Sequence, residues 1–573
     1  MQKELAAIPG VTVLIFDQTC AAEKRRRRKR GEFPDPDKRV IINELVCEGC
    51  GDCGVKSNCV SVQPLETEFG RKRVIDQSNC NKDFSCQKGF CPSFVTVHGA
   101  TLKKAAPVGS GVRDDFPALP TPTPRELLGS YGILVTGIGG TGVVTIGQII
   151  GMAAHVEGKG CGVIDMAGLA QKGGAVYVHV RVARTPDLIQ AIRVPAGGAQ
   201  LVLGGDFMVT GSAKVLSAIK PGVTTVIVNT DETLPGDFAR NADYSLPSER
   251  LKRELKSATR DTARFVPATA WATALFGNSI ATNMFLMGYA WQQGAIPLAE
   301  ESLLEAIRLN GEAVAMNQGA FLWGRRAAAH PELVAALVAT KQPKTEARRL
   351  SESQEERVAR RVAFLTAYQD AAYAARYADA VARITAAEQA RTPGQSALAE
   401  AVARYLFKLM AYKDEYEVAR LYADPAFEAQ LKAQFGDWKS LEFHLAPPLL
   451  SKTNPDTGEP IKRRFGPWML TAFRLLAKLK GLRGTRFDVF GHTHERRTER
   501  ALIDDYMALL DRLTRELTPA NHAVAVDLAK VPEKIRGFGH VKERHLKEAN
   551  TERDRLLARF ADTIEAPRRA AAE

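Results

Sequence analysis

The sequence contains no long apolar run. No stretch approaches the ~18 consecutive apolar residues that a membrane-spanning helix requires, and the N-terminus MQKELAAIPG lacks the apolar core of a signal peptide. We therefore expect a cytoplasmic chain with no membrane partner. Its 573 residues, 45% hydrophobic and 25% charged, are typical of a soluble globular protein with about three or four domains.

The strongly basic chain also lacks the signals of a nucleic-acid reader. The formal charge is +13, and the densest basic run, KRRRRKR, covers residues 24–30. No aromatic residues are interleaved in this run, and no helix-turn-helix or RNA-binding motif accompanies it. We expect a solvated or partner-facing segment and no nucleic-acid partner. The alternative, a basic scaffold that binds nucleic acid, predicts strong, salt-sensitive DNA binding.

Cysteine is scarce outside one segment, since seven of the nine cysteines lie within residues 47–91. In a reducing cytosol such clustering favours metal binding over disulfides. Structural zinc sites usually take two close ligand pairs, whereas a C-x2-C-x2-C loop with a remote Cys-Pro is typical of a bacterial iron-sulfur cubane. Cys47, Cys50 and Cys53 form the triplet, and Cys91 precedes Pro92. The spacing predicts a [4Fe-4S] cluster on these four residues.

Three further cysteines, Cys59, Cys80 and Cys86, remain in the same segment. Three thiolates are enough for a three-iron cluster, or for a four-iron cluster with one non-cysteine ligand. Alternatively, some of them are free buried thiols. The sequence leaves open whether the chain holds one cluster or two.

A glycine-rich turn follows the apolar run at residues 131–136. The segment GIGGTG fits G-x-G-x-x-G, and its candidate phosphate contacts are Gly137, Gly139, Gly140, Thr141 and Gly142. Glycines at a helix N-terminus let a phosphate approach backbone amides, where the helix dipole favours negative charge. If the ligand were NAD, Asp165 after the next strand would contact its ribose. Otherwise the turn only packs the helix on the sheet.

The expected fold class is multidomain α/β plus α. A β-branched run at residues 9–17 predicts a strand, and alternating strands and helices from residue 131 predict a parallel or mostly parallel sheet. We expect these parts: the end of another domain (1–40), a ferredoxin-like iron-sulfur domain (41–100), a linker (101–130), a Rossmann-like α/β domain (131–330) and a mainly helical domain (331–573).

This order of parts closely resembles the C-terminal half of the fused indolepyruvate ferredoxin oxidoreductases. The stretches that carry the resemblance are VTVLIFDQTCAAEKRRRRKRG, the cysteine segment from CEGCGDCG to CPSFVTV, GIGGTGVVTIGQII, DMAGLAQKGGAVYVHVR and GNSIATNMFLMGYAWQ. The resemblance implies an oxidoreductase that acts on the oxo group of its donor, with an iron-sulfur protein as acceptor. It also implies that residues 131–330 form the family's gamma domain.

The same resemblance implies a reaction and a set of partners. In that family a thiamine diphosphate carbanion attacks an aryl 2-oxoacid, carbon dioxide leaves, and two electrons pass through iron-sulfur clusters to ferredoxin. The acyl group goes to coenzyme A, for which Gly137 to Gly142 are sensible contacts. The complete enzyme is expected to be a homo-oligomer.

This sequence departs from the family's order of domains, because the thiamine-binding domains that we expect before residue 1 are not part of it. Residues 1 to about 30 resemble the end of such a domain. Thiamine diphosphate and Mg²⁺ are therefore expected only in the complete enzyme, and the isolated chain is expected to be inactive. The alternative function is an NAD- or flavin-linked iron-sulfur oxidoreductase that uses GIGGTG as its dinucleotide site.

Overall fold

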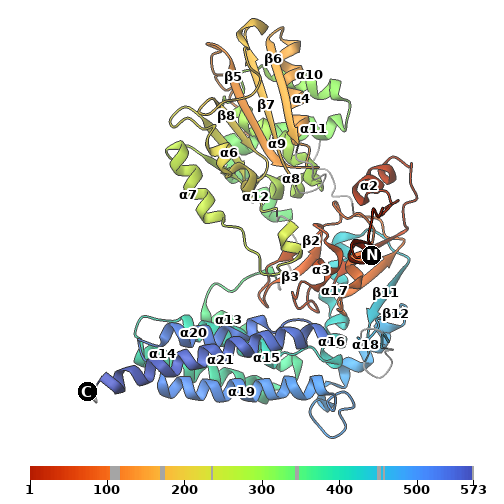
Figure 1. The fold of residues 1–573 in the computed structure, drawn as a ribbon, viewed down its shortest axis with the longest axis vertical. Coiled ribbons are helices and arrows are strands. Elements are labelled where there is room, and N and C mark those ends of the chain that lie inside the picture. Colours follow the sequence, from red (N-terminus) through yellow and green to blue (C-terminus); the bar gives the residue numbers. More distant parts are fainter. Residues whose placement is uncertain are drawn as a thin grey trace.

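A computed structural model describes residues 1–103, 116–167, 174–233, 236–341, 348–447, 453–455 and 459–570. Figure 1 shows an α/β domain, a smaller β-rich part that carries the cysteines, and an elongated layer of helices. Part of the expected linker, at 104–115, and part of the DMAGLAQKGG stretch, at 168–173, lie outside the described residues.

The sheet of the α/β domain has the strand order β10-β9-β8-β5-β7-β6. β10, β9, β8 and β5 are parallel neighbours, whereas β7 is antiparallel to both β5 and β6. The sheet is thus mixed rather than fully parallel. Its strands are β5 (Tyr131–Ile138), β6 (Gly160–Ala167), β7 (Ala175–Ala183), β8 (Leu201–Gly204), β9 (Thr225–Asn229) and β10 (Arg264–Val266).

Helices cover both faces of this sheet, which explains why β5 is buried along its whole length and reads as a continuous apolar run. The larger core contains side chains of α4 (Val143–Val156), α8 (Ala268–Phe276), α9 (Thr282–Gln292), α10 (Glu300–Asn310), α11 (Val314–Ala329) and α12 (Pro331–Lys341). It extends past the boundary expected at residue 330, because Val334 and Val338 belong to it. The opposite face carries α5 (Phe207–Thr210), α6 (Ala213–Leu216) and α7 (Ser248–Thr259).

Two glycines set the spacing of α9 and α11. A Cβ on Gly288 would lie 1.9 Å from the carbonyl oxygen of Phe321, and one on Gly324 would lie 1.9 Å from that of Phe285. Only glycine permits such close backbone approach. This packing supports the N-terminus of α9, which lies beside the glycine-rich turn.

The cysteine segment is built on an antiparallel pair, β1 (Lys38–Ile42) with β4 (Phe94–His98), and on a hairpin of β2 (Val62–Leu65) with β3 (Lys72–Ile75). The short helix α3 (Asp52–Ser57) carries part of the cysteine triplet. Two strands from the expected helical domain complete the sheet: β11 (Ser440–Leu445) pairs with β4, and β12 (Arg463–Phe465) pairs with β11. The segment is therefore joined to the C-terminal part by backbone hydrogen bonds.

The remainder of the C-terminal part is helical, as its periodicity predicts. Its principal core is formed by side chains between Leu365 and Phe560. The helices are α13 (Gln354–Tyr368), α14 (Ala371–Arg391), α15 (Ala397–Met410), α16 (Glu415–Ala423), α17 (Pro425–Gln434), α18 (Met469–Lys478), α19 (His494–Glu516), α20 (His522–Lys530) and α21 (Gly539–Ala570). Along the described part of the chain, no helix combines the length and apolarity needed to cross a bilayer.

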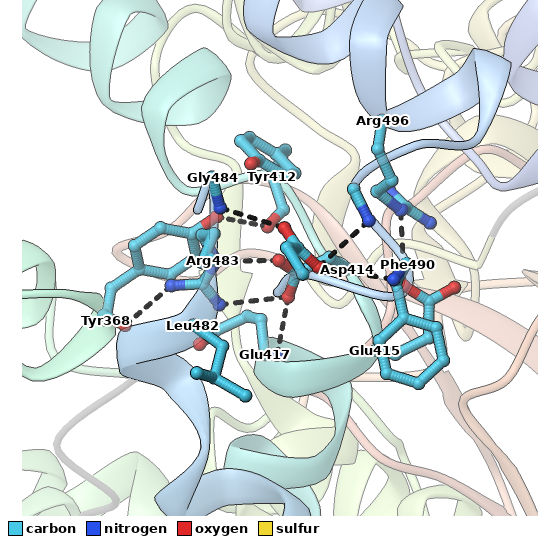
Figure 2. Close-up of polar contacts among 12 residues, drawn as sticks. Tyr368, Tyr412, Asp414, Glu415, Glu417, Leu482, Arg483, Gly484, Phe490 and Arg496 are labelled. Atoms are coloured by element: carbon cyan, nitrogen blue, oxygen red, sulfur yellow. Dashed lines mark hydrogen bonds and ion pairs between the residues drawn. The ribbon is translucent and has the colours of Figure 1, made fainter. Parts of the chain in front are cut away.

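A buried ionic cluster connects α13, α16 and the turn before α19 (Figure 2). Arg483 donates to both carboxylate oxygens of Asp414, at 2.6 and 2.9 Å, and its guanidinium lies 3.7 Å from the centroid of the Tyr368 ring. Asp414 also accepts a hydrogen bond from the backbone N–H of Glu417, which caps α16. The side chains of Arg483 and Asp414 are each 3% exposed, so each is the other's charge partner in the interior.

The prediction of a strand at residues 9–17 is wrong. This stretch lies between α1 (Gln2–Ala6) and α2 (Ala21–Lys29) and forms no strand. Val11, Ile15 and Phe16 are 97%, 85% and 82% exposed. A β-branched run becomes a strand only where another strand pairs with it, and residues 9–17 pair with no strand of the described chain.

Candidate functional site

The first cysteine set consists of Cys47, Cys50, Cys53 and Cys91. Two glycines with left-handed backbone, Gly49 (φ 65°) and Gly51 (φ 80°), turn the chain between the first three cysteines. The loop is packed tightly, because a Cβ on Gly49 would lie 2.1 Å from the carbonyl oxygen of Arg71. The remote Cys91 is brought in by β4, whose start lies three residues beyond it.

The thiols of this set lie close enough to act on one another electrostatically. Burial, together with Cys47, raises the pKa of Cys91 to about 11. Burial and the other three thiols raise the pKa of Cys53 well above its ordinary value, and burial with Cys91 and Cys47 raises that of Cys50. Four clustered thiolates, of which those of Cys47, Cys53 and Cys91 are buried and that of Cys50 is half-buried, would repel one another, so their ionised forms require a bound cationic group.

Hydrogen-bond donors point at these sulfurs. The backbone N–H of Gly49 donates to Cys47 Sγ at 3.3 Å, and the hydroxyl of Ser93 lies 2.9 Å from Cys91 Sγ. Donors of this kind stabilise negative charge on cluster sulfurs and tune the cluster's potential. Within the described ranges, no three His, Cys, Asp or Glu side chains are arranged around a single metal ion. The soft donors, their burial and their N–H partners fit a thiolate-ligated iron-sulfur cluster.

The second cysteine set consists of Cys59, Cys80 and Cys86. Burial, and to a lesser degree the nearby thiols of Cys80 and Cys59, raises the pKa of Cys86 to about 12. Burial also raises the pKa of Cys80, while the N–H of Lys82 donates to its sulfur at 3.4 Å. The electrostatic neighbours thus divide the seven cysteines into the four and the three that the spacing suggests.

One half-buried cation, Lys462, lies near both sets. Lys462, which precedes β12, donates to the carbonyl oxygens of Gln87, at 2.5 Å, and Gly89. Burial lowers its pKa, while Cys91 and Cys86, one from each set, oppose that shift. A lysine between two thiolate sets favours added negative charge on either of them. Sequence reasoning missed this residue, because it lies 371 positions beyond Cys91.

The glycine-rich turn lies where β5 meets α4. Gly142 caps α4 in left-handed conformation (φ 86°), and the amide of Asn283, at the start of α9, donates to the carbonyl oxygen of Thr141 at 2.6 Å. Gly140 also has left-handed backbone (φ 88°), and an added Cβ there would meet no atom within 4 Å. The turn therefore offers open space beside the N-terminus of α4, as a phosphate site requires.

A buried carboxyl lies at the same edge of the sheet. Asp206 follows β8, caps α5 through a hydrogen bond from the N–H of Val209, and is 2% exposed. Its Oδ2 has no hydrogen-bond partner among the described residues, and burial raises its pKa to about 6. A Cβ on Gly137 would lie 3.8 Å from the backbone nitrogen of Asp206. The sequence signal that could have predicted Asp206 is its position just after the buried strand β8, which is parallel to β5.

Asp165 is not brought to the glycine-rich turn. It lies exposed on the edge strand β6, opposite Val178 of β7, and β7 separates β6 from β5. Two strand spacings amount to about 10 Å. A ribose-binding acid belongs on the strand adjacent to the glycine-rich turn, so this order disfavours the dinucleotide alternative.

The cysteine segment packs against the loop that follows β9. An added Cβ on Gly54 would lie 3.0 Å from the carbonyl oxygen of Ala239, and Arg73 donates to the carbonyl oxygen of Ala242 at 2.8 Å. Cys59 and Glu232 line one small cavity of about 90 Å³. Of the second cysteine set, Cys59 therefore lies beside the loop that follows β9.

Known proteins match about a third of the chain. The IorB subunit of indolepyruvate oxidoreductase from Pyrococcus horikoshii is 30% identical over 201 residues, which cover 35% of this chain and 96% of that protein. The chain belongs to the indolepyruvate ferredoxin oxidoreductase family. The Archaeoglobus fulgidus IorB subunit is 29% identical over 177 residues, which cover 31% of this chain and 83% of that protein.

Two family profiles match separate parts of the chain. Residues 132–327 match the pyruvate ferredoxin/flavodoxin oxidoreductase family, and residues 354–555 match a family of unknown function, DUF6537. The first match confirms the expected oxidoreductase class, and residues 132–327 coincide closely with the expected gamma domain. The second covers most of the helical part, which is also the part without a functional motif.

Two solved structures have low similarity to the chain. A pyruvate oxidoreductase subunit from Thermotoga maritima is 17% identical, with 34% of this chain and 96% of that chain covered and a TM-score of 0.26. The 2-oxoglutarate:ferredoxin oxidoreductase from Magnetococcus marinus, solved with 2-oxoglutarate, coenzyme A and succinyl-CoA, is 18% identical. The match covers 40% of this chain and 34% of that chain, with a TM-score of 0.27.

Proposed function

We propose that this chain is the electron-transfer and acyl-transfer part of an aryl 2-oxoacid:ferredoxin oxidoreductase, with indolepyruvate as the expected substrate. The grouping of Cys47, Cys50, Cys53 and the remote Cys91 into one buried set carries the proposal. A [4Fe-4S] cluster on this set would supply one-electron redox chemistry. The thiols hold it, and the N–H of Gly49 and the cation of Lys462 stabilise the negative charge gained on reduction.

The second cysteine set extends the electron path. Cys59, Cys80 and Cys86 are grouped and half-buried or buried, which supports a second cluster rather than free thiols. Cys59 faces the loop after β9, where acyl transfer would take place, while Cys80 lies beside the basic helix α2. Electrons would then pass from the sheet edge to the surface.

Coenzyme A is the proposed ligand of the glycine-rich turn. It carries a diphosphate, which backbone amides at a helix N-terminus bind well. Gly137, Gly139, Gly140, Thr141 and Gly142 supply those amides or the space beside them. The full chain is expected to bind coenzyme A more tightly than NAD, as measured by calorimetry. Tighter NAD binding would favour the dinucleotide alternative.

Decarboxylation requires a partner that supplies thiamine diphosphate and Mg²⁺. Within this chain, no GDG motif of thiamine enzymes is found. The exposed apolar residues Val11, Ile15 and Phe16 fit a surface that such a partner covers. We expect indolepyruvate-dependent ferredoxin reduction only when this chain is mixed with the thiamine-binding part. Turnover by the chain alone would contradict this division of labour.

Ferredoxin, an acidic electron carrier, is the proposed acceptor, and α2 is its proposed docking surface. Arg25 and Arg28 donate to the carbonyl oxygens of Ser78 and Asn81, which flank Cys80. Arg26 and Arg27 are 49% and 46% exposed and share the single carboxylate of Glu23. Exposed cations beside a redox centre steer an acidic partner.

A charge-matched pair of variants tests this surface. Arg26→Gln with Arg27→Gln is expected to weaken ferredoxin binding about tenfold at low salt and to reduce its salt dependence. Arg250→Gln with Arg308→Gln removes the same charge from exposed helix positions of the α/β domain. Equal effects of the two pairs would show a general charge effect and count against docking at α2.

A further inference from the structure

A large cavity lies where the three parts of the molecule meet. Its volume is about 850 Å³, and it is lined by the β2–β3 turn, the loop at residues 243–245, α13, α15 and the residues around 533–536. Figure 1 shows the β2–β3 hairpin between the α/β domain and the helices. We refer to this cavity as the junction chamber. It is separate from the glycine-rich turn, none of whose residues lines it.

The lining of the junction chamber carries excess positive charge. Nine lysines and arginines face six aspartates and glutamates. Lys72, Arg357, Lys408 and Lys534 have no carboxylate within ion-pair distance among the described residues, and Arg404 has only Glu400 at 3.9 Å. A concave site lined mainly by one sign of charge concentrates ligands of the opposite sign.

The paired charges in the lining are structural. Glu68, in the β2–β3 turn, accepts from Arg361 of α13 and from the backbone N–H of Ser351, so it fixes the hairpin to the helices. Lys413 pairs with Glu48 at 2.5 Å. These pairs hold the walls together without Arg357, Arg404 and Lys534. Lys72 and Lys408 donate to backbone carbonyl oxygens of the walls, but no carboxylate of the described residues balances their charge.

Lys408 shows that nearby carboxylates balance little of the positive charge of the unpaired cations. Its ammonium donates to the carbonyl oxygens of Pro532 and Glu533, at 2.8 and 2.9 Å. Burial lowers its pKa to about 7, which the more distant Glu48 only partly opposes. A bound anion would restore the charged form of this lysine.

Aromatic side chains lie beside these cations. Phe364 and Phe407 line the junction chamber together with Tyr405, and Phe69 packs on both phenylalanines with ring centroids 5.0 and 5.5 Å away. Apolar rings next to several cations suit a ligand with a flat organic group and multiple negative charges. One carboxylate would need only one arginine, whereas four cations here have no carboxylate within ion-pair distance among the described residues.

We propose that the junction chamber binds a small molecule that carries a diphosphate or a larger phosphate group. Its cationic contacts are Arg357, Arg404 and Lys408 from the helical part and Lys72 from the cysteine segment. This assigns to the helices of residues 354–555 the role of one wall of a ligand site. The inference does not depend on the proposed reaction.

Inorganic pyrophosphate, ADP and coenzyme A are the probes for the full-length chain, and calorimetry measures their binding. Arg357→Gln with Arg404→Gln is expected to weaken pyrophosphate binding at least tenfold. The control, Arg376→Gln with Arg383→Gln, removes the same charge from α14, where these arginines are 53% and 54% exposed and pair with aspartates. It is expected to bind pyrophosphate like the wild type.

The organic probes separate the possible sources of the phosphate group. ADP or coenzyme A is expected to bind at least tenfold more tightly than pyrophosphate if the aromatic residues contribute, and Phe407→Leu should remove that gain. Gly140→Ala, which changes only the glycine-rich turn, should leave pyrophosphate binding intact. No pyrophosphate binding at millimolar concentration, or equal weakening by the two arginine pairs, would overturn the proposal.

Discussion

Replacing Gly140 by alanine distinguishes a phosphate-binding turn from one that only packs α4 on the sheet. Gly140 has φ 88° and open space around a new Cβ. The substitution should therefore lower the free energy of unfolding only by the cost of holding alanine in a left-handed conformation, about 1–2 kcal/mol. The methyl group would, however, occupy the space through which a phosphate reaches the turn. We expect coenzyme A binding to weaken about tenfold, equivalent to about 1.4 kcal/mol.

The chain offers matched controls for this substitution. Gly158, just beyond α4, also has left-handed backbone (φ 67°) and no atom within 4 Å of a new Cβ, so Gly158→Ala carries the same strain far from the turn. Gly142→Ala should cost more, about 2–3 kcal/mol, because its Cβ would lie 2.3 Å from Asn283 Nδ2 and disturb the hydrogen bond to Thr141.

Calorimetry with coenzyme A, on chains that all carry Arg357→Gln and Arg404→Gln to weaken binding in the junction chamber, measures the effect on affinity, and hydrogen exchange of α4 measures the effect on folding. The reasoning predicts lost affinity for Gly140→Ala and wild-type affinity for Gly158→Ala, with similar protection of α4 in both. If Gly140→Ala binds coenzyme A like the wild type, the turn is a packing element and the proposed site is refuted.

Three further perturbations test other parts of the account. Arg483→Met leaves Asp414 buried without a charge partner and should destabilise the helical part by about 3–5 kcal/mol, as measured by urea unfolding; a loss below 1 kcal/mol would contradict this. Burial, and to a lesser degree the positive charge of Lys214, lowers the pKa of His179 to about 4 in the folded chain, compared with 6.5 in the unfolded chain. The neutral His179 side chain should therefore contribute up to about 3 kcal/mol to the free energy of unfolding above pH 6.5, and this contribution should be lost as the pH falls toward 4. If the free energy of unfolding of His179→Gln depends on pH as in the wild type, this explanation is excluded. Lys462→Gln should make the clusters harder to reduce, and a potential equal to that of the wild type in redox titration would exclude a role for this cation.

Local sequence patterns predicted those features that depend on short-range geometry. The C-x2-C-x2-C spacing placed Cys47, Cys50 and Cys53 on one loop, whereas the role of Cys91 as the remote fourth ligand stays a prediction. The run from residue 131 and the glycines after it gave a strand, a turn and a helix at the expected positions. In each case neighbouring residues determine the conformation.

Features that depend on pairing between distant segments could not be read in this way. Strand order is one, because nothing in the run at residues 175–183 says that it enters the sheet between β5 and β6 and so separates Asp165 from the glycine-rich turn. The pairing of β11 with β4, across more than 300 residues, is another. The run at residues 9–17 has strand-forming residues but no partner strand.

Iron and acid-labile sulfide counts, combined with EPR of the anaerobically reconstituted and reduced chain, test the central claim most directly. The account predicts a [4Fe-4S] signal that Cys47→Ser removes and Cys86→Ser leaves in place, while Cys86→Ser lowers the iron content that the second set contributes. A chain that takes up zinc but no iron, or a Cys47→Ser variant that keeps the full iron content and the full EPR signal of the wild type, would contradict the account.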